Sequence, residues 1–374
     1  MARWRRITRI AGISAGAAAA GVGAVITAER LAAHRLRLFP DPAADEPFGE
    51  LRGREFAVLA PDGVPLHVEV NGPDDAPVTI IFCHGYALNQ DSWHYQRRDL
   101  AGVARVVFWD QRGHGRSGRA AGQPVTVDQT GGDLDAVIGS VAAESSRVIL
   151  VGHSMGGMTI MALAGQHPEL FGSRVAGVVL IATTAGGLSG PDGLVPGMPS
   201  PLRTFLQHVA PALLTVAAAG RQAALIERGR KVSKELELVA TRYMAFGDPQ
   251  ASMTLTEFLE RMIREVPLGV IAQFYRALLG CDQHGVLGVL GRVPVTVVTG
   301  DRDRVVPPRL GTELAAEIPG ARLITVPGAG HAVMLERPDV VNDAITSLLR
   351  EIRSGNRPRP SQQPGDGGGV RGVA

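Results

Sequence analysis

Short runs of apolar, β-favouring residues alternate with helix-favouring segments along most of this chain. Several runs are almost continuously hydrophobic, among them "VTIIFC", "RVVFW" and "VAGVVLI", as strands buried on both faces require. The runs predict strands at residues 55–59, 65–70, 78–83, 105–109, 148–152, 175–181, 293–298 and 322–326. Helical patterns separate many of them, notably at residues 127–143, 155–166, 307–318 and 338–352. The alternation predicts an α/β fold with a doubly wound, mostly parallel eight-stranded sheet.

One interval breaks this alternation. Between about residues 187 and 291 no run favours a strand, whereas "LTEFLERMIREV" and "GVIAQFYRALLG" carry apolar residues at helical spacing. A segment of that length is too long for a loop. We therefore predict a helical cap at residues 188–290, inserted between core segments 50–187 and 291–353. It would cover the carboxyl ends of the strands, where active sites of such sheets lie.

The two ends of the chain differ from this core. Residues 10–28 contain no charged residue, and a helix of that length spans about 28 Å, close to the thickness of a bilayer core. Their Ala and Gly content weakens insertion. An uncleaved membrane anchor, an export signal and a soluble N-terminal helix therefore all stay open for residues 10–28, the last leaving the protein cytoplasmic. Residues 1–49 would comprise this segment and a linker to the core. The polar, Pro- and Gly-rich residues 354–374 predict a disordered tail.

Charge and cysteine content exclude several classes of protein. Residues 1–40 carry seven arginines and one glutamate in a chain of net charge +2, so the remainder is net negative and lacks the basic footprint of a nucleic-acid-binding domain. The cysteines, Cys83 and Cys281, have no metal-ligand spacing. Because Cys83 ends an apolar run, we expect it to be a buried free thiol. No metal or cofactor is expected.

The pattern G-x-S-x-G occurs twice, as "GISAG" at residues 12–16 and "GHSMG" at residues 152–156. It is typical of a nucleophile elbow, where a serine lies on a tight turn between a strand and a helix. Only the second match has a predicted strand before it and a predicted helix after it, with glycines that permit a sharp bend. Ser154 is therefore the predicted nucleophile, and Ser14 is a small residue in an apolar run.

A serine hydroxyl needs a base to take its proton and an acid to orient that base. Asp301 and Asp303 lie in a loop after the predicted strand 293–298, and His331 lies in a loop after strand 322–326. The order serine, acid, histidine is the one expected for this type of sheet. Spacing alone does not separate the two aspartates.

The negative oxygen that forms during attack on a carbonyl needs hydrogen-bond donors already in place. The backbone N–H of Met155, which follows the nucleophile, is one expected donor. The other is the N–H of Tyr86, in the loop after strand 78–83. His84 lies in the same loop, and we interpret it as a residue that shapes the turn.

Five motifs together resemble the α/β-hydrolase superfamily. They are "HGY" at 84–86, "DQRGHGRS" at 110–117, "GHSMGG" at 152–157, "GDRDRVVP" at 300–307 and "GAGHAVMLERP" at 328–338. The resemblance covers residues 54–352. It implies that Asp303 is the acid, that Asp301 is a turn residue, and that "DQRGHGRS" is a structural loop. Superfamily members that open epoxides or remove halides use an aspartate as nucleophile, so Ser154 argues against both activities.

The resemblance implies a serine hydrolase of the carboxylesterase or lipase kind, which forms an acyl-enzyme on Ser154. A cofactor-free haloperoxidase or perhydrolase, or a carbon–carbon bond hydrolase, would carry the same triad, and a non-catalytic ligand-binding protein would keep the fold. Apolar cap residues favour a small-molecule ester with an apolar part, although core packing explains them equally well. These residues are Leu259, Met262, Phe274 and Leu278.

Overall fold

The computed structural model describes residues 41–119, 125–144, 146–190 and 234–355. Eight strands form one sheet in the order β1-β2-β4-β3-β5-β6-β7-β8. The strands are β1 (Arg54–Leu59), β2 (Pro65–Asn71), β3 (Val78–Cys83), β4 (Arg105–Trp109), β5 (Arg147–His153), β6 (Val175–Ile181), β7 (Val295–Gly300) and β8 (Arg322–Val326). β2 pairs antiparallel with both β1 and β4, and the other pairs are parallel. The predicted mostly parallel sheet is confirmed.

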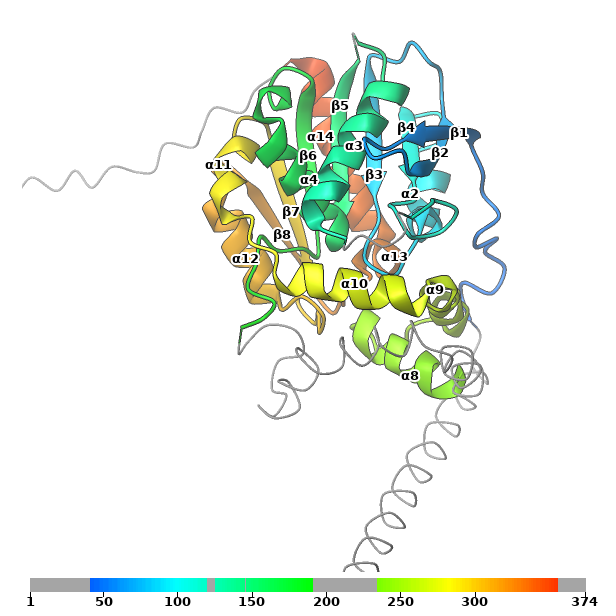
Figure 1. The fold of residues 1–374 in the computed structure, drawn as a ribbon. Coiled ribbons are helices and arrows are strands. Elements are labelled where there is room, and N and C mark those ends of the chain that lie inside the picture. The colour runs from blue at the N-terminus through cyan, green and yellow to red at the C-terminus, as the bar shows by residue number, and fades with distance from the viewer. Residues whose placement is uncertain (1–40, 120–124, 145, 191–233, 356–374) are drawn as a thin grey trace, which may run out of the picture.

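Helices cover both faces of the sheet (Figure 1). On one face α3 (Val127–Val141), α4 (Met155–Gln166) and α12 (Pro308–Glu317) share an apolar core with the strands. On the other, α2 (His94–Asp99), α13 (Val333–Glu336) and α14 (Pro338–Ser354) bury a second core. Two short 3-10 helices, η1 (Gln90–Trp93) and η2 (Pro168–Leu170), follow β3 and α4 in the chain. Cys83 is fully buried at the end of β3, and both cysteines are free, which confirms the predicted buried thiol.

The order of the strands creates a crevice at one place in the sheet. β3 and β5 are neighbours in the sheet. The connection from β3 leads to β4 on one side, and the connection from β5 leads to β6 on the other. Ligand sites of open α/β sheets lie outside the carboxyl ends of the strands at such a switch point. In the register of this pair Cys83 lies opposite Gly152. The loop containing Tyr86 and the turn containing Ser154 therefore begin side by side.

Between β6 and β7 the described residues form helices and turns and contain no strand. The elements are α8 (Lys234–Ala245), α9 (Met253–Glu265), α10 (Leu268–Leu279), η4 (His284–Val286) and α11 (Leu287–Leu290). Figure 1 shows α8, α9 and α10 at one end of the sheet. They contact loops that follow strands, for example where the Ala332 N–H, beyond β8, donates to the Ala245 carbonyl. This placement agrees with a cap, whose bounds of 188 and 290 remain a prediction.

Residues 41–49, expected as part of a linker, pack against the cap. The Asp41 carboxylate accepts hydrogen bonds from the backbone N–H and hydroxyl of Thr254 at 2.9 and 3.0 Å. The Phe48 ring stacks on Phe258 of α9 at 4.7 Å. In the part of the chain that the structure describes, no helix has both the length and the apolarity to cross a membrane. The predicted segment 10–28 and most of the predicted tail lie outside the described residues.

Candidate active site

Ser154 lies in a strained turn between β5 and α4. Its backbone has φ 51° and ψ −116°, a region that a non-glycine residue occupies only when its surroundings impose it. Its N–H donates to the Ile181 carbonyl at the end of β6, and its carbonyl accepts the Thr183 hydroxyl at 2.7 Å. The neighbouring strand thus holds both sides of the turn. Such strain at a strand-to-helix turn is typical of a nucleophile elbow.

Glycines make this turn possible, as the sequence predicts. A Cβ atom on Gly156 would lie 2.0 Å from the Cys83 carbonyl oxygen, and one on Gly152 would lie 2.5 Å from the Gly156 oxygen. A Cβ on Gly157 would meet the Thr183 side chain at 2.5 Å. Any larger residue would force the end of β3 away from the start of α4.

The structure brings His331 to Asp303 and not to Asp301. His331 Nδ1 donates to Asp303 Oδ2 at 2.8 Å, and the Asp303 side chain is fully buried. The other oxygen, Oδ1, accepts the N–H groups of Val305 and Val306 at 2.8 and 2.9 Å. Asp301 instead accepts the Gly328 N–H at an exposed turn. Asp303 is therefore placed to orient the imidazole, and each of its oxygens accepts at least one hydrogen bond.

His153, the residue before Ser154 in the chain, contacts His331. The rings of His153 and His331 are 4.8 Å apart, and His153 Nε2 donates to the His331 carbonyl at 2.9 Å. Because Nδ1 of His331 carries the proton given to Asp303, its Nε2 is free to accept another. No hydrogen bond joins that nitrogen to the Ser154 hydroxyl among the described residues.

Two backbone N–H groups at the carboxyl ends of β3 and β5 have no acceptor among the described residues. Within the part of the chain that the structure describes, neither the Tyr86 N–H nor the Met155 N–H donates to another residue. Met155 is the first residue of α4, so the positive end of the helix dipole lies at this point. Both donors lie at adjacent strand ends, where the sequence predicts an oxyanion hole.

Three further histidines lie near these groups, all buried in the neutral form. Burial lowers the pKa of His84 to about 4 and that of His114 to about 3, and lowers the pKa of His153 well below its ordinary value. His84 donates to the Gly85 carbonyl and accepts the Gln111 N–H. It therefore shapes the turn, as we interpreted from the sequence.

The sequence interpretation missed His153 and His114. His153 occupies the variable position of G-x-S-x-G and His114 lies in "DQRGHGRS", a motif assigned only a structural part. The Nδ1 atom of His153 is buried without a partner, and a Cβ on Gly85 would lie 2.5 Å from it. His153 thus fills the space between the Tyr86 loop and the His331 loop.

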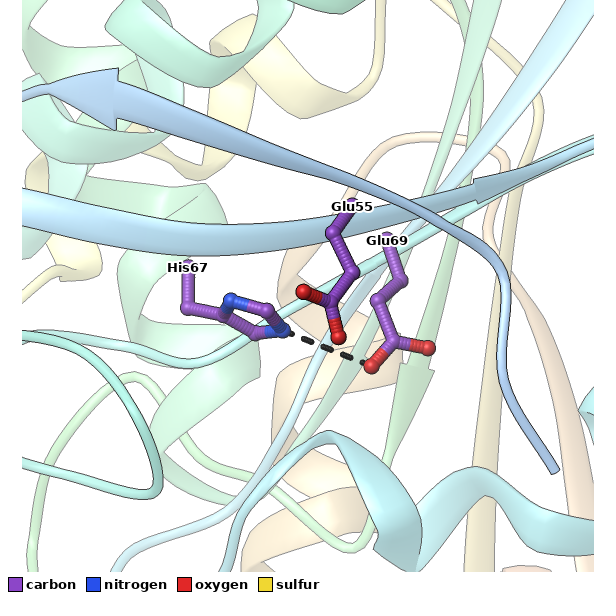
Figure 2. Close-up of side chains that lie close together, drawn as sticks. All are labelled: Glu55, His67 and Glu69. Atoms are coloured by element: carbon purple, nitrogen blue, oxygen red, sulfur yellow. Dashed lines mark hydrogen bonds and ion pairs between the residues drawn. The ribbon is translucent and has the colours of Figure 1, made fainter. Parts of the chain in front are cut away.

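One group of side chains away from this edge has the residue types of a metal site. Glu55, His67 and Glu69 extend from β1 and β2 toward one another (Figure 2), with ligand atoms within 4.8 Å. The Arg116 guanidinium, however, donates to both carboxylates, and Arg97 donates to Glu69 at 2.7 Å. A cation would have to displace Arg116. We call these five residues the β2 network and interpret it as an ion-pair cluster.

Sequence comparison finds known proteins that are similar to this chain. The chain is 28% identical over 294 residues to the dihydrolipoyllysine-residue acetyltransferase component of the acetoin cleaving system of Pseudomonas putida, covering 76% of this chain and 66% of that protein. It is also 28% identical over 303 residues to a bifunctional esterase/perhydrolase of Acinetobacter calcoaceticus, covering 78% of this chain and 99% of that enzyme.

Solved structures show the same fold. A thermophilic esterase from Thermogutta terrifontis matches with a TM-score of 0.62 at 23% identity, covering 80% of this chain and 99% of that one. Residues 78–338 match the family described as alpha/beta hydrolase fold, which includes β3 to β8 and every residue singled out above at the strand ends. The chain therefore belongs to the alpha/beta hydrolase fold family.

Proposed function

We propose that this protein is a serine hydrolase that cleaves carboxylic esters of small molecules. The observation that carries the proposal is the Asp303–His331 hydrogen bond of 2.8 Å on loops beside the strained Ser154 turn. Spacing left two aspartates open, and only Asp303 makes this contact. Relatives whose names include esterase and perhydrolase support the same reaction class.

In the proposed reaction, the Ser154 hydroxyl attacks the ester carbonyl while its proton passes to His331 Nε2. The carbonyl oxygen becomes negative and accepts hydrogen bonds from the Tyr86 and Met155 N–H groups. His331 then gives the proton to the leaving alkoxide, which departs as the alcohol and leaves an acyl group on Ser154. A water molecule, deprotonated by His331, attacks that acyl group and releases the acid.

The missing hydrogen bond between Ser154 and His331 does not oppose this assignment. Catalytic hydrogen bonds are often long or poorly aligned without substrate and tighten only in the complex. The buried Asp303 carboxylate stabilises the imidazolium that forms when His331 takes the proton. Since both Asp303 oxygens have partners, the imidazole remains oriented through both half-reactions.

The apolar cap residues, from which the sequence suggested an apolar substrate, are buried in the protein core and do not support that suggestion. Leu259, Met262, Phe274 and Leu278 are each at most 8% exposed and belong to the two apolar cores. Core packing explains them, so the acyl-chain preference has to be measured. A series of p-nitrophenyl esters of increasing acyl length provides that measurement.

A fluorophosphonate probe tests the proposed nucleophile. Wild-type protein should label at Ser154, and Ser154→Ala should abolish labelling and lower kcat by about a millionfold. The exposed Ser173→Ala is the matched control and should retain both signals. Labelling that survives in Ser154→Ala, or the absence of labelling in active wild-type protein, would exclude Ser154 as the nucleophile.

Perhydrolysis is the second candidate activity, favoured by the bifunctional esterase/perhydrolase relative. Hydrogen peroxide would replace water in the attack on the acyl-enzyme and release a peracid. An assay for peracid formed from acetate and hydrogen peroxide, run beside the ester series, separates the two. Negligible turnover of every ester would exclude the esterase function.

We further propose that residues 10–28 bring the enzyme to a membrane, supported by their length and lack of charge. Fractionation of the full chain and of a chain lacking residues 1–40 tests this. The full chain should be in the membrane fraction and the truncated one should not. Equal behaviour of the two would contradict an anchor.

A further inference from the structure

Helix α10 of the cap contacts the loop that carries the Tyr86 N–H. The Tyr86 hydroxyl donates to the Ile271 carbonyl in the first turn of α10 at 2.6 Å, across 185 residues of sequence. Burial raises the pKa of this phenol well above its ordinary value, so it remains a donor. Tyr86 thus offers its backbone N–H to the predicted oxyanion hole beside Ser154, while its side chain is bonded to the cap.

A second contact joins the same two elements by another route. Phe274 of α10 packs against the His114 ring with centroids 4.9 Å apart. His114 Nε2 in turn accepts the Ala87 N–H at 3.2 Å, and its Nδ1 donates to the Arg112 carbonyl at 3.0 Å. Ala87 directly follows Tyr86 and has φ 57°. A non-glycine residue in this region is strained by about 1–3 kcal/mol and needs such outside contacts to stay there.

The start of the loop, at His84, is therefore fixed to the core, whereas the Tyr86 side chain in its middle is fixed to the cap. His84 is bonded to Gln111, at the end of β4, through two hydrogen bonds of 2.9 and 2.6 Å. These bonds are independent of α10. The direction of the Tyr86 N–H, by contrast, depends on a hydroxyl and an imidazole that both contact α10.

We propose that α10 positions the oxyanion-binding N–H of Tyr86, with the Tyr86 phenol and the His114 imidazole as the positioning groups. The inference rests on the proposed ester hydrolysis. Movement of α10 away from the sheet breaks the Tyr86–Ile271 bond and the Phe274–His114 contact together. The oxyanion hole is then complete only while the cap is docked.

This arrangement has a specific kinetic consequence. Hydrogen bonds to the carbonyl oxygen strengthen as negative charge develops on it, so a misdirected N–H weakens binding of the transition state more than binding of the substrate. Loss of a positioning group should lower kcat and leave KM nearly unchanged. A residue that only contacts substrate would raise KM instead.

The test is Tyr86→Phe, which deletes one hydroxyl and keeps the ring, compared with Tyr243→Phe on the exposed surface of α8. We expect kcat for p-nitrophenyl acetate to fall about tenfold, the loss expected for one hydrogen bond, with KM within about twofold. The affinity for an alkylboronic acid, which forms a tetrahedral adduct on Ser154, should fall by the same factor. Tyr243→Phe should match wild type.

The cap side is tested by Phe274→Leu, with thermal unfolding measured to show that the variant is folded. We expect the same parallel loss of kcat and boronic acid affinity. Unchanged values in both variants, or a rise of KM alone, would overturn the proposal; a loss in Tyr86→Phe alone would overturn the part assigned to His114. Wild-type protein that fluorophosphonate does not label would instead refute the proposed hydrolysis itself.

Discussion

Two polar clusters lie close to the apolar core of this protein, and they differ in how completely their hydrogen-bonding groups are paired. In the β2 network, Glu69 accepts from the Gly53 N–H, Gln90, Arg97 and Arg116 and contacts His67. At the strand-end site, made of Tyr86, Ser154, Met155, Asp303 and His331, the Asp303–His331 pair is bonded, whereas the Tyr86 and Met155 backbone N–H groups have no acceptor among the described residues.

The difference separates a stabilising cluster from a reactive one. Buried polar groups are normally satisfied, and each exception calls for an explanation. Saturated charges in the β2 network tie β1 and β2 to the loop after β4 and leave no position for a cation. Unused donors beside a strained serine are the groups that a developing oxyanion requires. Residue type alone would not separate the two clusters, since the β2 network has the ligands of a metal site.

Apart from removal of the nucleophile itself, the largest loss of kcat is expected from breaking the Asp303–His331 pair at the strand-end site. Asp303→Asn should lower kcat about 10⁴-fold, because the amide NH2 that faces His331 Nδ1 donates instead of accepting and the imidazole takes the wrong tautomer. Asp301→Asn is the matched control in the same loop and should stay within about threefold of wild type. Steady-state hydrolysis of p-nitrophenyl acetate measures both. Similar losses in the two variants would mean that the acid is misassigned.

Removing the Glu69 carboxylate, at the centre of the β2 network, should lower the stability of the fold and leave kcat unchanged. Glu69→Gln leaves the buried Arg97 without a charged partner and should lower the free energy of unfolding by about 3 kcal/mol. The kcat of the folded protein should stay at the wild-type value. Urea unfolding at pH 7 measures this, with the exposed Glu55→Gln expected to cost less than about 1 kcal/mol.

The stability lost in Glu69→Gln should depend on pH. Burial alone would raise the pKa of Glu69, but the His67 and Gly53 contacts and the charges of Arg97 and Arg116 outweigh it and lower the pKa from 4.5 to about 2. A lowered pKa gives stability that is present above pH 4.5 and is lost as the pH falls through about 2. The difference in free energy of unfolding between wild type and Glu69→Gln should therefore shrink as the pH falls from 4.5 to about 2. A constant difference would show that the carboxylate's charge is not responsible.

The smallest effect is expected at the border of the strand-end site. His153→Phe removes the hydrogen bond to the His331 carbonyl and should lower kcat about tenfold, with labelling of Ser154 retained. The surface residue His167, replaced in the same way, is the control. Wild-type kcat in His153→Phe would show that packing alone holds the His331 loop.

Much of this architecture could be predicted from the sequence. All eight strands lie at the predicted positions within about two residues, because strands buried on both faces leave a continuous apolar run. The Ser154 turn was recognisable because its glycines and flanking elements are local features. The contacts of His153 and His114 could not be predicted, since each joins segments far apart in the chain.

The sequence by itself determined the fold, the place of the strained serine and the loops that follow each strand, because periodicity and turn chemistry act between near neighbours. Spacing left Asp301 and Asp303 open and the family resemblance implied Asp303, which the structure pairs with His331. Only the tertiary structure decided that Arg116 pairs with both Glu55 and Glu69 and that the Tyr86 hydroxyl pairs with α10. Pairing depends on where distant segments meet, and burial makes each pair energetically significant.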